Sequence, residues 1–155
     1  METIRGKTSL DLDLHELTAR LANHNRVHLD LGTGDGRYVR TLADAHPDWF
    51  VIGVDACREN LHKHSRAKLQ NMLFVIAEAQ ALPRELHGLV AHIAINFPWG
   101  SLLDSLLTGD PALIDGLAIQ VLMNDTQVNP EHMQRMCREV AASLIGFELE
   151  PATSG

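Results

Sequence analysis

The segment DLGTGDG, residues 30–36, combines three glycines with two acidic residues. A glycine-rich turn between a strand and a helix lets a ligand approach the backbone closely and meet free amide groups. The spacing G-x-G-x-G differs from the dinucleotide fingerprint G-x-G-x-x-G, which holds a pyrophosphate at a helix N-terminus. Asp30 would repel a pyrophosphate but suits a cationic amine. The segment therefore predicts a pocket for a ligand with an amino group, and the alternative is a tight turn without a ligand.

Asp55 supplies another carboxylate, 19 positions after Gly36 and at the end of the next apolar run. A carboxylate at this point fits the hydroxyl groups of a ribose, although it could instead only cap the following helix. An acid for an amino group, glycines for close approach and an acid for ribose together describe S-adenosylmethionine. The next apolar run leads to Ala79 and Gln80, where Gln80 either bonds the adenine edge or remains a solvated loop side chain. The predicted cofactor-binding residues are Asp30, Gly32, Thr33, Gly34, Gly36, Asp55, Ala56, Ala79, Gln80 and Asn96.

The tetrapeptide NFPW, residues 96–99, follows a further apolar run. It resembles the Asn/Asp-Pro-Pro-aromatic motif of amino-group and ring-nitrogen methyltransferases, with Phe97 in place of the first proline. In that motif a backbone carbonyl or the Asn amide accepts hydrogen bonds from a planar amine, and the aromatic ring stacks on the substrate, which is worth roughly 1–3 kcal/mol per base. Asn96, Pro98 and Trp99 are the predicted catalytic residues, because methyl transfer to a ring nitrogen needs positioning rather than a general base. The alternative is that Trp99 packs beneath the next helix and Pro98 only ends a strand.

Short apolar runs alternate with helical patterns along the chain. This alternation predicts βαβ units and a doubly wound, mostly parallel α/β sheet, at whose carboxyl strand ends ligands bind. The predicted strands are residues 27–31, 50–55, 73–77, 90–96 and 117–123, and they lack polar alternation, as strands covered on both faces do. Helices are predicted over residues 14–23, 36–45, 58–68, 101–107 and about 130–145, and a hairpin over residues 3–12.

The composition is that of a soluble globular protein, with 155 residues, 45% hydrophobic and 21% charged. Residues 1–155 are expected to form a single domain. No apolar run approaches the roughly 18 residues of a membrane span, and the N-terminus lacks the apolar region of a signal peptide. Cys57 and Cys137 have no metal-site spacing and favour a reducing cytoplasm. The nine histidines form no ligand framework, so no metal site is predicted.

The formal net charge of −7 bears on the partners of this chain. A protein that binds a phosphate backbone usually shows a basic excess or a basic stripe. The only cationic cluster, formed by Arg58, Lys63, Arg66 and Lys68, either solvates a helix face or binds nucleic acid. The composition argues mildly against a large RNA partner bound by this chain alone.

Residues 6 to about 107 resemble the aminoglycoside-resistance methyltransferases that modify adenine N1 in the decoding site of 16S ribosomal RNA. The segments that resemble the family are KTSLDLDLHELT, RVHLDLGTGDGR, VIGVDACRENL, LFVIAEAQALP and FPWGSLL. The resemblance implies a class I, Rossmann-like fold in which Asp30, Gly32, Asp55, Ala79 and Gln80 line the S-adenosylmethionine pocket. It also implies that Trp99 is one of two tryptophans that enclose the flipped adenine, and that the Pro98 carbonyl lies near its amino group. The function it implies is ribosomal RNA methylation, with antibiotic resistance as the outcome.

The chain also departs from this family. Family members carry a long connection between their last two strands, with the second stacking tryptophan and basic residues for ribosomal RNA. Here the segment FELE, residues 147–150, follows the last predicted helix, and the other tryptophan, Trp49, stands before the second predicted strand. Asn96 occupies a position that is more usually apolar. The C-terminal strands are therefore expected to be missing, and the unpaired sheet edge favours a homodimer.

Two alternative functions remain open at this level. The first is a shortened module that binds S-adenosylmethionine without independent catalysis, which the net charge and the missing tryptophan favour. The second is a tRNA guanine-N7 methyltransferase, whose sequences are similar to HPDWFVIGVD, residues 46–55. Those enzymes carry Pro-Asp-Pro-Trp-Pro followed by basic residues, which this chain does not contain.

Overall fold

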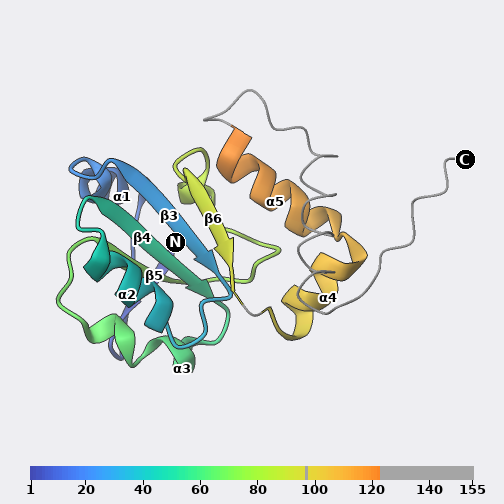
Figure 1. The fold of residues 1–155 in the computed structure, drawn as a ribbon, viewed down its shortest axis with the longest axis horizontal. Helices are drawn as coiled ribbons and strands as arrows, with labels where there is room; N and C mark the ends of the chain where they lie inside the picture. The colour runs from blue at the N-terminus through green and yellow to red at the C-terminus, as the bar shows by residue number, and fades with distance from the viewer. Residues whose placement is uncertain (97, 123–155) are drawn as a thin grey trace, which may run out of the picture.

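The computed structural model describes residues 1–96 and 98–122, which fold around one sheet (Figure 1). Four of its strands are parallel, and an antiparallel hairpin is added beside β5, which lies at one end of these four. The mostly parallel sheet and the N-terminal hairpin predicted from the sequence are confirmed. In the order in which they lie side by side, the strands are β2 (Thr8–Asp11), β1 (Glu2–Arg5), β5 (Met72–Ile76), β4 (Trp49–Asp55), β3 (Arg26–Leu31) and β6 (His92–Ile95).

Helices cover both faces of the sheet, as the doubly wound prediction requires. They are α1 (Leu14–Leu21), α2 (Arg37–Ala45), α3 (Arg58–Leu61), α4 (Gly100–Thr108) and α5 (Pro111–Leu122), with short 3-10 turns η1 (His64–Arg66) and η2 (Arg84–Leu86). Leu17 of α1 and Leu102 of α4 belong to a core with Leu29 and Ile52 of the sheet. On the opposite face, Val39 of α2 packs in a second core.

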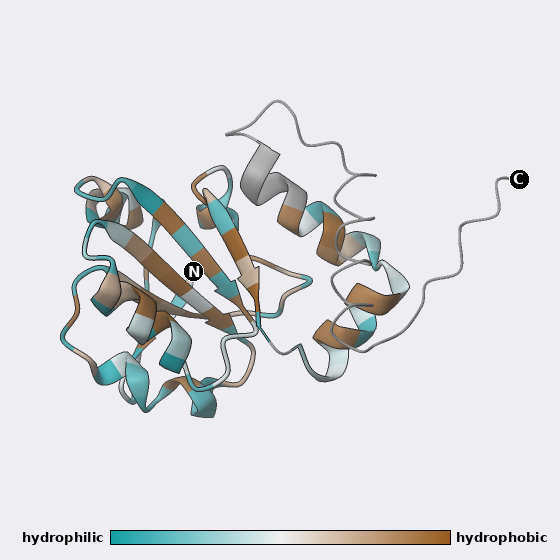
Figure 2. Cartoon of the chain, viewed as in Figure 1, coloured by the Kyte–Doolittle hydropathy of each residue, from teal (hydrophilic) through white to brown (hydrophobic). Residues whose placement is uncertain are grey.

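Strand β3 differs from its neighbours because its hydrophobic and hydrophilic residues alternate (Figure 2). Val27, Leu29 and Leu31 enter the core shared with α1, α4 and α5. His28 and Asp30 are buried as well, at 2% and 1% exposure. The prediction of strands without alternation is therefore wrong for β3, where two polar residues are buried on the second face of the sheet.

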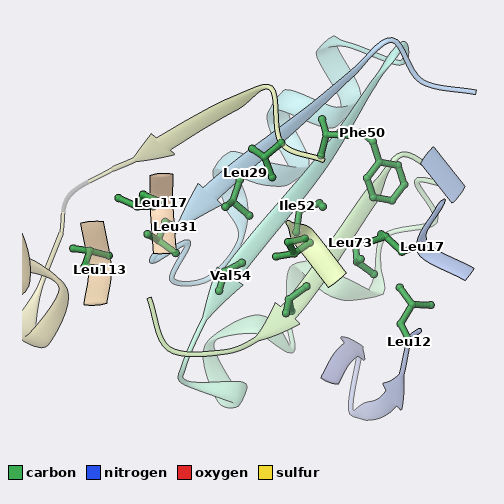
Figure 3. Close-up of a cluster of buried hydrophobic side chains, with 14 of the residues drawn as sticks. Leu12, Leu17, Leu29, Leu31, Phe50, Ile52, Val54, Leu73, Leu113 and Leu117 are labelled. Carbon is green, nitrogen blue, oxygen red and sulfur yellow. The ribbon is translucent and has the colours of Figure 1, made fainter. Parts of the chain in front are cut away.

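The segment 117–123 was predicted as a strand, and this prediction is wrong. Residues 117–122 are part of α5, and Met123 lies outside the described residues. The Asp110 carboxylate accepts a hydrogen bond from the Ala112 amide at the start of this helix, while Leu113 and Leu117, four residues apart, both reach the core beside Leu31 (Figure 3). A buried apolar run can be a helix or a strand, and periodicity alone does not distinguish the two.

Other boundaries differ less from their predictions. The segment 58–68 divides into α3 and η1, and the strand expected over residues 90–96 is limited to β6. The helix predicted near residues 130–145 and the segment 147–150 lie outside the described residues. Within the part of the chain that the structure describes, no helix is long and apolar enough to cross a membrane. β6 forms one edge of the described sheet, and a homodimer through this edge stays a prediction.

His28 is a buried titratable group near the amino ends of the strands. Its ring lies 4.8 Å from that of His92 and 6.1 Å from that of Trp49, measured between centroids. Neither ring nitrogen has a hydrogen-bond partner among the described residues. Burial, together with the nearby His92, lowers the pKa of His28 to about 4, because the charged imidazolium is poorly solvated there.

We predict a pH dependence of stability from His28. Its pKa is lower in the folded chain than in the unfolded chain, so below pH 6.5 the unfolded state binds the additional proton and gains stability. The free energy of unfolding should fall by about 2 kcal/mol between pH 7 and pH 5 on account of this one residue. Urea unfolding of His28→Leu should lack this decrement, while His15→Gln on the exposed face of α1 should retain it. An equal pH dependence in all three proteins would contradict the assignment.

Candidate functional site

The predicted site residues follow the carboxyl ends of the parallel strands. Leu31 of β3 is in register with Val54 of β4 and Ile95 of β6, and Asp55 is in register with Ile76 of β5. The segments that leave these strands therefore meet at one edge of the sheet. This is the edge at which open α/β sheets bind their ligands.

The glycine loop is attached to the end of β4 by its backbone. The amides of Gly32 and Thr33 both donate to the Val54 carbonyl, at 2.9 and 3.0 Å. The Gly34 amide donates to Asp55 Oδ2 at 2.8 Å. The loop and the acidic strand end are therefore one unit, although they are predicted from separate motifs.

Asp55 has a local role in the fold. Its Oδ1 accepts hydrogen bonds from the Cys57 amide at 2.8 Å and from the Asn60 side chain at 3.4 Å. These contacts support the alternative that Asp55 caps the segment entering α3. With the Gly34 amide they use three of the roughly four acceptor positions of a carboxylate, which leaves one position for a ribose hydroxyl.

Gly36 has a packing role. A Cβ atom at this position would lie 2.4 Å from the ring of Phe74, and the residue has a φ of +76°. It lines neither cavity described below. The structure thus brings Gly36 against the core, whereas Gly34, with nothing within 4 Å of its Cβ position, faces open space.

A first cavity has a volume of about 530 Å³ and lies beyond the carboxyl ends of β4 and β5. We call it the β4–β5 cavity. The predicted residues that line it are Gly32, Gly34, Asp55, Ala56, Ala79, Gln80 and Trp99. The Gln80 side-chain amide donates to Ser105 Oγ of α4 at 2.8 Å. Gln80 is thus held at the cavity wall, with its carbonyl oxygen as the remaining acceptor.

A second cavity of about 690 Å³, the β3–β6 cavity, adjoins the first at Gly32, Gly34 and Trp99. It contains Asp30, Thr33 and Asn96. The Asn96 side-chain amide donates to Asp30 Oδ1 at 2.9 Å. Asp30 therefore accepts a hydrogen bond from a neutral donor. Asp30 itself is almost fully buried.

The electrostatics of Asp30 are unusual for a carboxylate. Burial raises the pKa of Asp30 above its ordinary value, and the nearby charge of Asp55 acts in the same direction. The side chains of Thr33 and, to a smaller extent, Asn96 oppose this shift. A cationic group of a ligand in the β3–β6 cavity, which Asp30 lines, would stabilise a buried anion of this kind.

Trp99 lies between the two cavities and is 82% exposed. The alternative in which its ring packs beneath the next helix is therefore wrong. α4 begins at the next residue, Gly100. Pro98 is half-buried and lines neither cavity, so of the predicted catalytic residues only Asn96 and Trp99 face this space.

Trp49 is far from this edge, as its place before the second predicted strand indicates. Trp49 begins β4 and Asp55 ends it. At the rise of an extended strand, the two residues are about 20 Å apart. The Trp49 ring stacks on His46 at 4.2 Å, with the Arg26 guanidinium 5.1 Å from its centroid. It contributes to the amino end of the sheet rather than to the site.

Several lining residues were not predicted. Asn60, Glu78 and Ser101 line the β4–β5 cavity, and Arg37 and Tyr38 line the β3–β6 cavity. The position of Glu78, immediately before Ala79, is a signal that could have identified it. Tyr38 lies on the first turn of α2 and is 40% exposed. The sequence around an exposed helix residue does not indicate whether it lines a cavity, so Tyr38 has no such signal.

A further cavity of about 410 Å³ lies elsewhere, lined by residues of α1, β1 and β5. It includes none of the predicted site residues. The predicted residues are thus concentrated at a single edge of the sheet, and the comparison with known proteins concerns that edge.

The model of the family NpmA, 16S rRNA (adenine(1408)-N(1))-methyltransferase, matches residues 2–143. The chain belongs to this family. It is 39% identical over 126 residues to the Escherichia coli protein of that name, covering 76% of this chain and 58% of the relative. A second relative, from Streptoalloteichus hindustanus, is 32% identical and is covered to 65%, with 96% of this chain aligned. The chain thus spans less than two thirds of the length of these curated family members.

Solved structures show the same fold. The aminoglycoside resistance methyltransferase NpmB1 matches with a TM-score of 0.76 and 33% identity, covering 91% of this chain and 84% of that protein. A variant of the 16S rRNA (adenine(1408)-N(1))-methyltransferase from Catenulisporales acidiphilia with the cosubstrate SAM matches with a TM-score of 0.74 and 29% identity, over 78% of this chain and 63% of that protein. By contrast, the tRNA (guanine-N(7)-)-methyltransferase of Brevibacillus brevis, 33% identical, aligns with only 52% of this chain and 41% of the relative.

The two glycines provide a matched test of the loop in this family member. Gly36→Ala should lower the free energy of unfolding by about 2–4 kcal/mol, because it adds both a strained positive φ and a clash with Phe74. Gly34→Ala should cost only about 1–2 kcal/mol, the cost of the positive φ alone. Chemical unfolding of both variants measures the difference. Equal losses would show that Phe74 does not require a glycine at position 36.

Proposed function

We propose that the chain is the cofactor-binding part of an S-adenosylmethionine-dependent methyltransferase that acts on adenine N1 of 16S ribosomal RNA. The observation that supports this most is the pair of adjoining cavities, which share Gly32, Gly34 and Trp99. Each cavity has a carboxylate that the strands position, Asp55 in the first, beside Glu78, and Asp30 in the second, beside Asp35. Two acids of separate roles match the two polar ends of S-adenosylmethionine.

The β4–β5 cavity takes the adenosine half of the cofactor. Asp55 accepts from a ribose hydroxyl, Ala56 and Ala79 form apolar contacts, and the Gln80 carbonyl oxygen accepts from the adenine amino group. Asp30 receives the ammonium group of the methionine half, which is why its carboxylate is buried beside open space. S-adenosylmethionine supplies an electrophilic methyl group on its sulfonium.

The residues of the chain orient the acceptor. Trp99 offers an exposed ring at the junction of the cavities, and a flipped base stacks there, which offsets part of the cost of extrusion. Adenine N1 already has a lone pair, so alignment with the methyl group supplies most of the rate.

A second candidate function is cofactor binding without independent methylation. It is favoured by the single tryptophan that the described residues place at this edge, and by the net charge of −7, which weakens attraction to RNA. In either case we expect the chain in the cytoplasm, where the ribosome is. Methylation of the decoding site would give aminoglycoside resistance, as it does for the aminoglycoside-resistance methyltransferases that the chain resembles.

Asp55→Ala tests the cofactor proposal by isothermal titration with S-adenosylmethionine. The dissociation constant should rise by a factor corresponding to about 1–3 kcal/mol, because a charged hydrogen-bond partner is lost. Asp44→Ala, which removes an exposed carboxylate of α2, should bind as the unchanged chain does. Unfolding curves of both variants control for damage to the loop. No binding by the folded unchanged chain would refute the cofactor proposal.

Trp99→Ala tests the acceptor proposal with a labelled methyl donor and 30S subunits. Since the ring is exposed, the variant should fold and bind S-adenosylmethionine normally, while methyl transfer to the 30S subunit falls at least tenfold, the order of one lost stacking contact. Trp99→Phe should restore part of the transfer. Cofactor binding with no transfer by the unchanged chain would instead support the binding module.

A further inference from the structure

Asn96 and Asp30 are 66 positions apart in the sequence but are hydrogen-bonded, with 2.9 Å between Asn96 Nδ2 and Asp30 Oδ1. They meet because β6 pairs with β3 in parallel and Asn96 follows directly after β6. An ionised carboxylate only accepts hydrogen bonds, so the NH₂ group of Asn96 must face Asp30. The orientation of the Asn96 amide is therefore determined by its partner.

We propose that Asn96 is a positioning residue, whose carboxamide holds the Asp30 carboxylate in the orientation that receives the ammonium group of the cofactor. This inference rests on the proposed function, in which Asp30 is the partner of that ammonium group. It gives Asn96 a role in addition to the predicted one, in which its amide bonds the methyl acceptor. One N–H of the Asn96 amide donates to Asp30, and its second N–H and its carbonyl oxygen are left for other partners.

Because Asp30 is buried, a neutral hydrogen-bond donor beside it stabilises its carboxylate. The residue is 1% exposed, so water contributes little to the stability of its charge. Asn96 stabilises the carboxylate without neutralising it, whereas a lysine or arginine in its place would compete with the cationic ligand. An apolar side chain at position 96 would leave the carboxylate with one donor fewer and free to rotate away from the cavity.

The titratable and charged groups around Asp30 come from the end of β4, the glycine loop and α2. Asp55, at the end of β4, raises the pKa of Asp30 in addition to the larger effect of burial. Asp35, Arg37 and Tyr38, on the loop and the first turn of α2, line the same cavity. Since the Asn96 hydrogen bond acts against burial, its removal should raise the pKa of Asp30 further, and a ligand that needs the ionised form should be lost at a higher pH.

The experiment compares two ligands on the full chain and on Asn96→Leu between pH 5 and pH 8. S-adenosylhomocysteine carries the ammonium group, and 5′-methylthioadenosine lacks the whole amino-acid part. In the variant, S-adenosylhomocysteine should bind roughly tenfold more weakly at pH 7, and its affinity should begin to fall at a higher pH than in the unchanged chain. The affinity for 5′-methylthioadenosine should be the same in both proteins at every pH.

Each other outcome has a defined meaning. An equal loss of affinity for both ligands would overturn the proposal, because it would show a general change of the pocket. An unchanged pH profile for S-adenosylhomocysteine would overturn it as well. Failure of the unchanged chain to bind either ligand would refute the proposed function itself, which separates the two failures. Asn96→Ala, measured beside Asn96→Leu, should give the same shift and excludes an effect of the larger side chain.

Discussion

The parallel register of β3 between β4 and β6 is the constraint on which the site depends. It aligns Leu31 with Val54 on one side and with Ile95 on the other. The glycine loop, the Asp55 carboxylate and the segment containing Trp99 therefore leave the sheet at one level. Backbone hydrogen bonds from the loop to Val54 then attach the loop to β4, so that no side chain is needed to hold it near the cavities.

The second consequence of this register is a buried acid. Asp30 occupies a strand position that would be apolar if stability alone were favoured, since an uncompensated buried carboxylate costs free energy. Its neighbour Asn96 supplies one hydrogen bond from the adjacent strand end. His28, two residues earlier on the same face, is buried without a hydrogen-bond partner for its ring nitrogens among the described residues. β3 thus combines an apolar face that stabilises the fold with a polar face on which Asp30 lines the β3–β6 cavity.

Much of this arrangement could be predicted from local patterns. The apolar runs of β3, β4 and β5, the hairpin and the glycine loop each have their signal within a few adjacent residues, and the resemblance to the methyltransferase family agrees with them. The segment 117–122 was mistaken for a strand because a buried helix has the same apolar run. The packing of Gly36 on Phe74 and the bond between Asn96 and Asp30 depend on contacts across the sheet, which no local pattern encodes. The same reason explains why Tyr38 was missed.

The central claim is that the carboxyl edge of the sheet, and no other part of the described chain, binds S-adenosylmethionine. Amide chemical shifts of the ¹⁵N-labelled chain, followed during a titration with S-adenosylhomocysteine, test this claim most directly. We predict shifts at Gly32, Gly34, Asp55 and Ala79, with the amides of His28 and Trp49 at the amino ends unchanged. Shifts confined to the cavity lined by α1, β1 and β5, or no shifts at saturating ligand, would contradict the account.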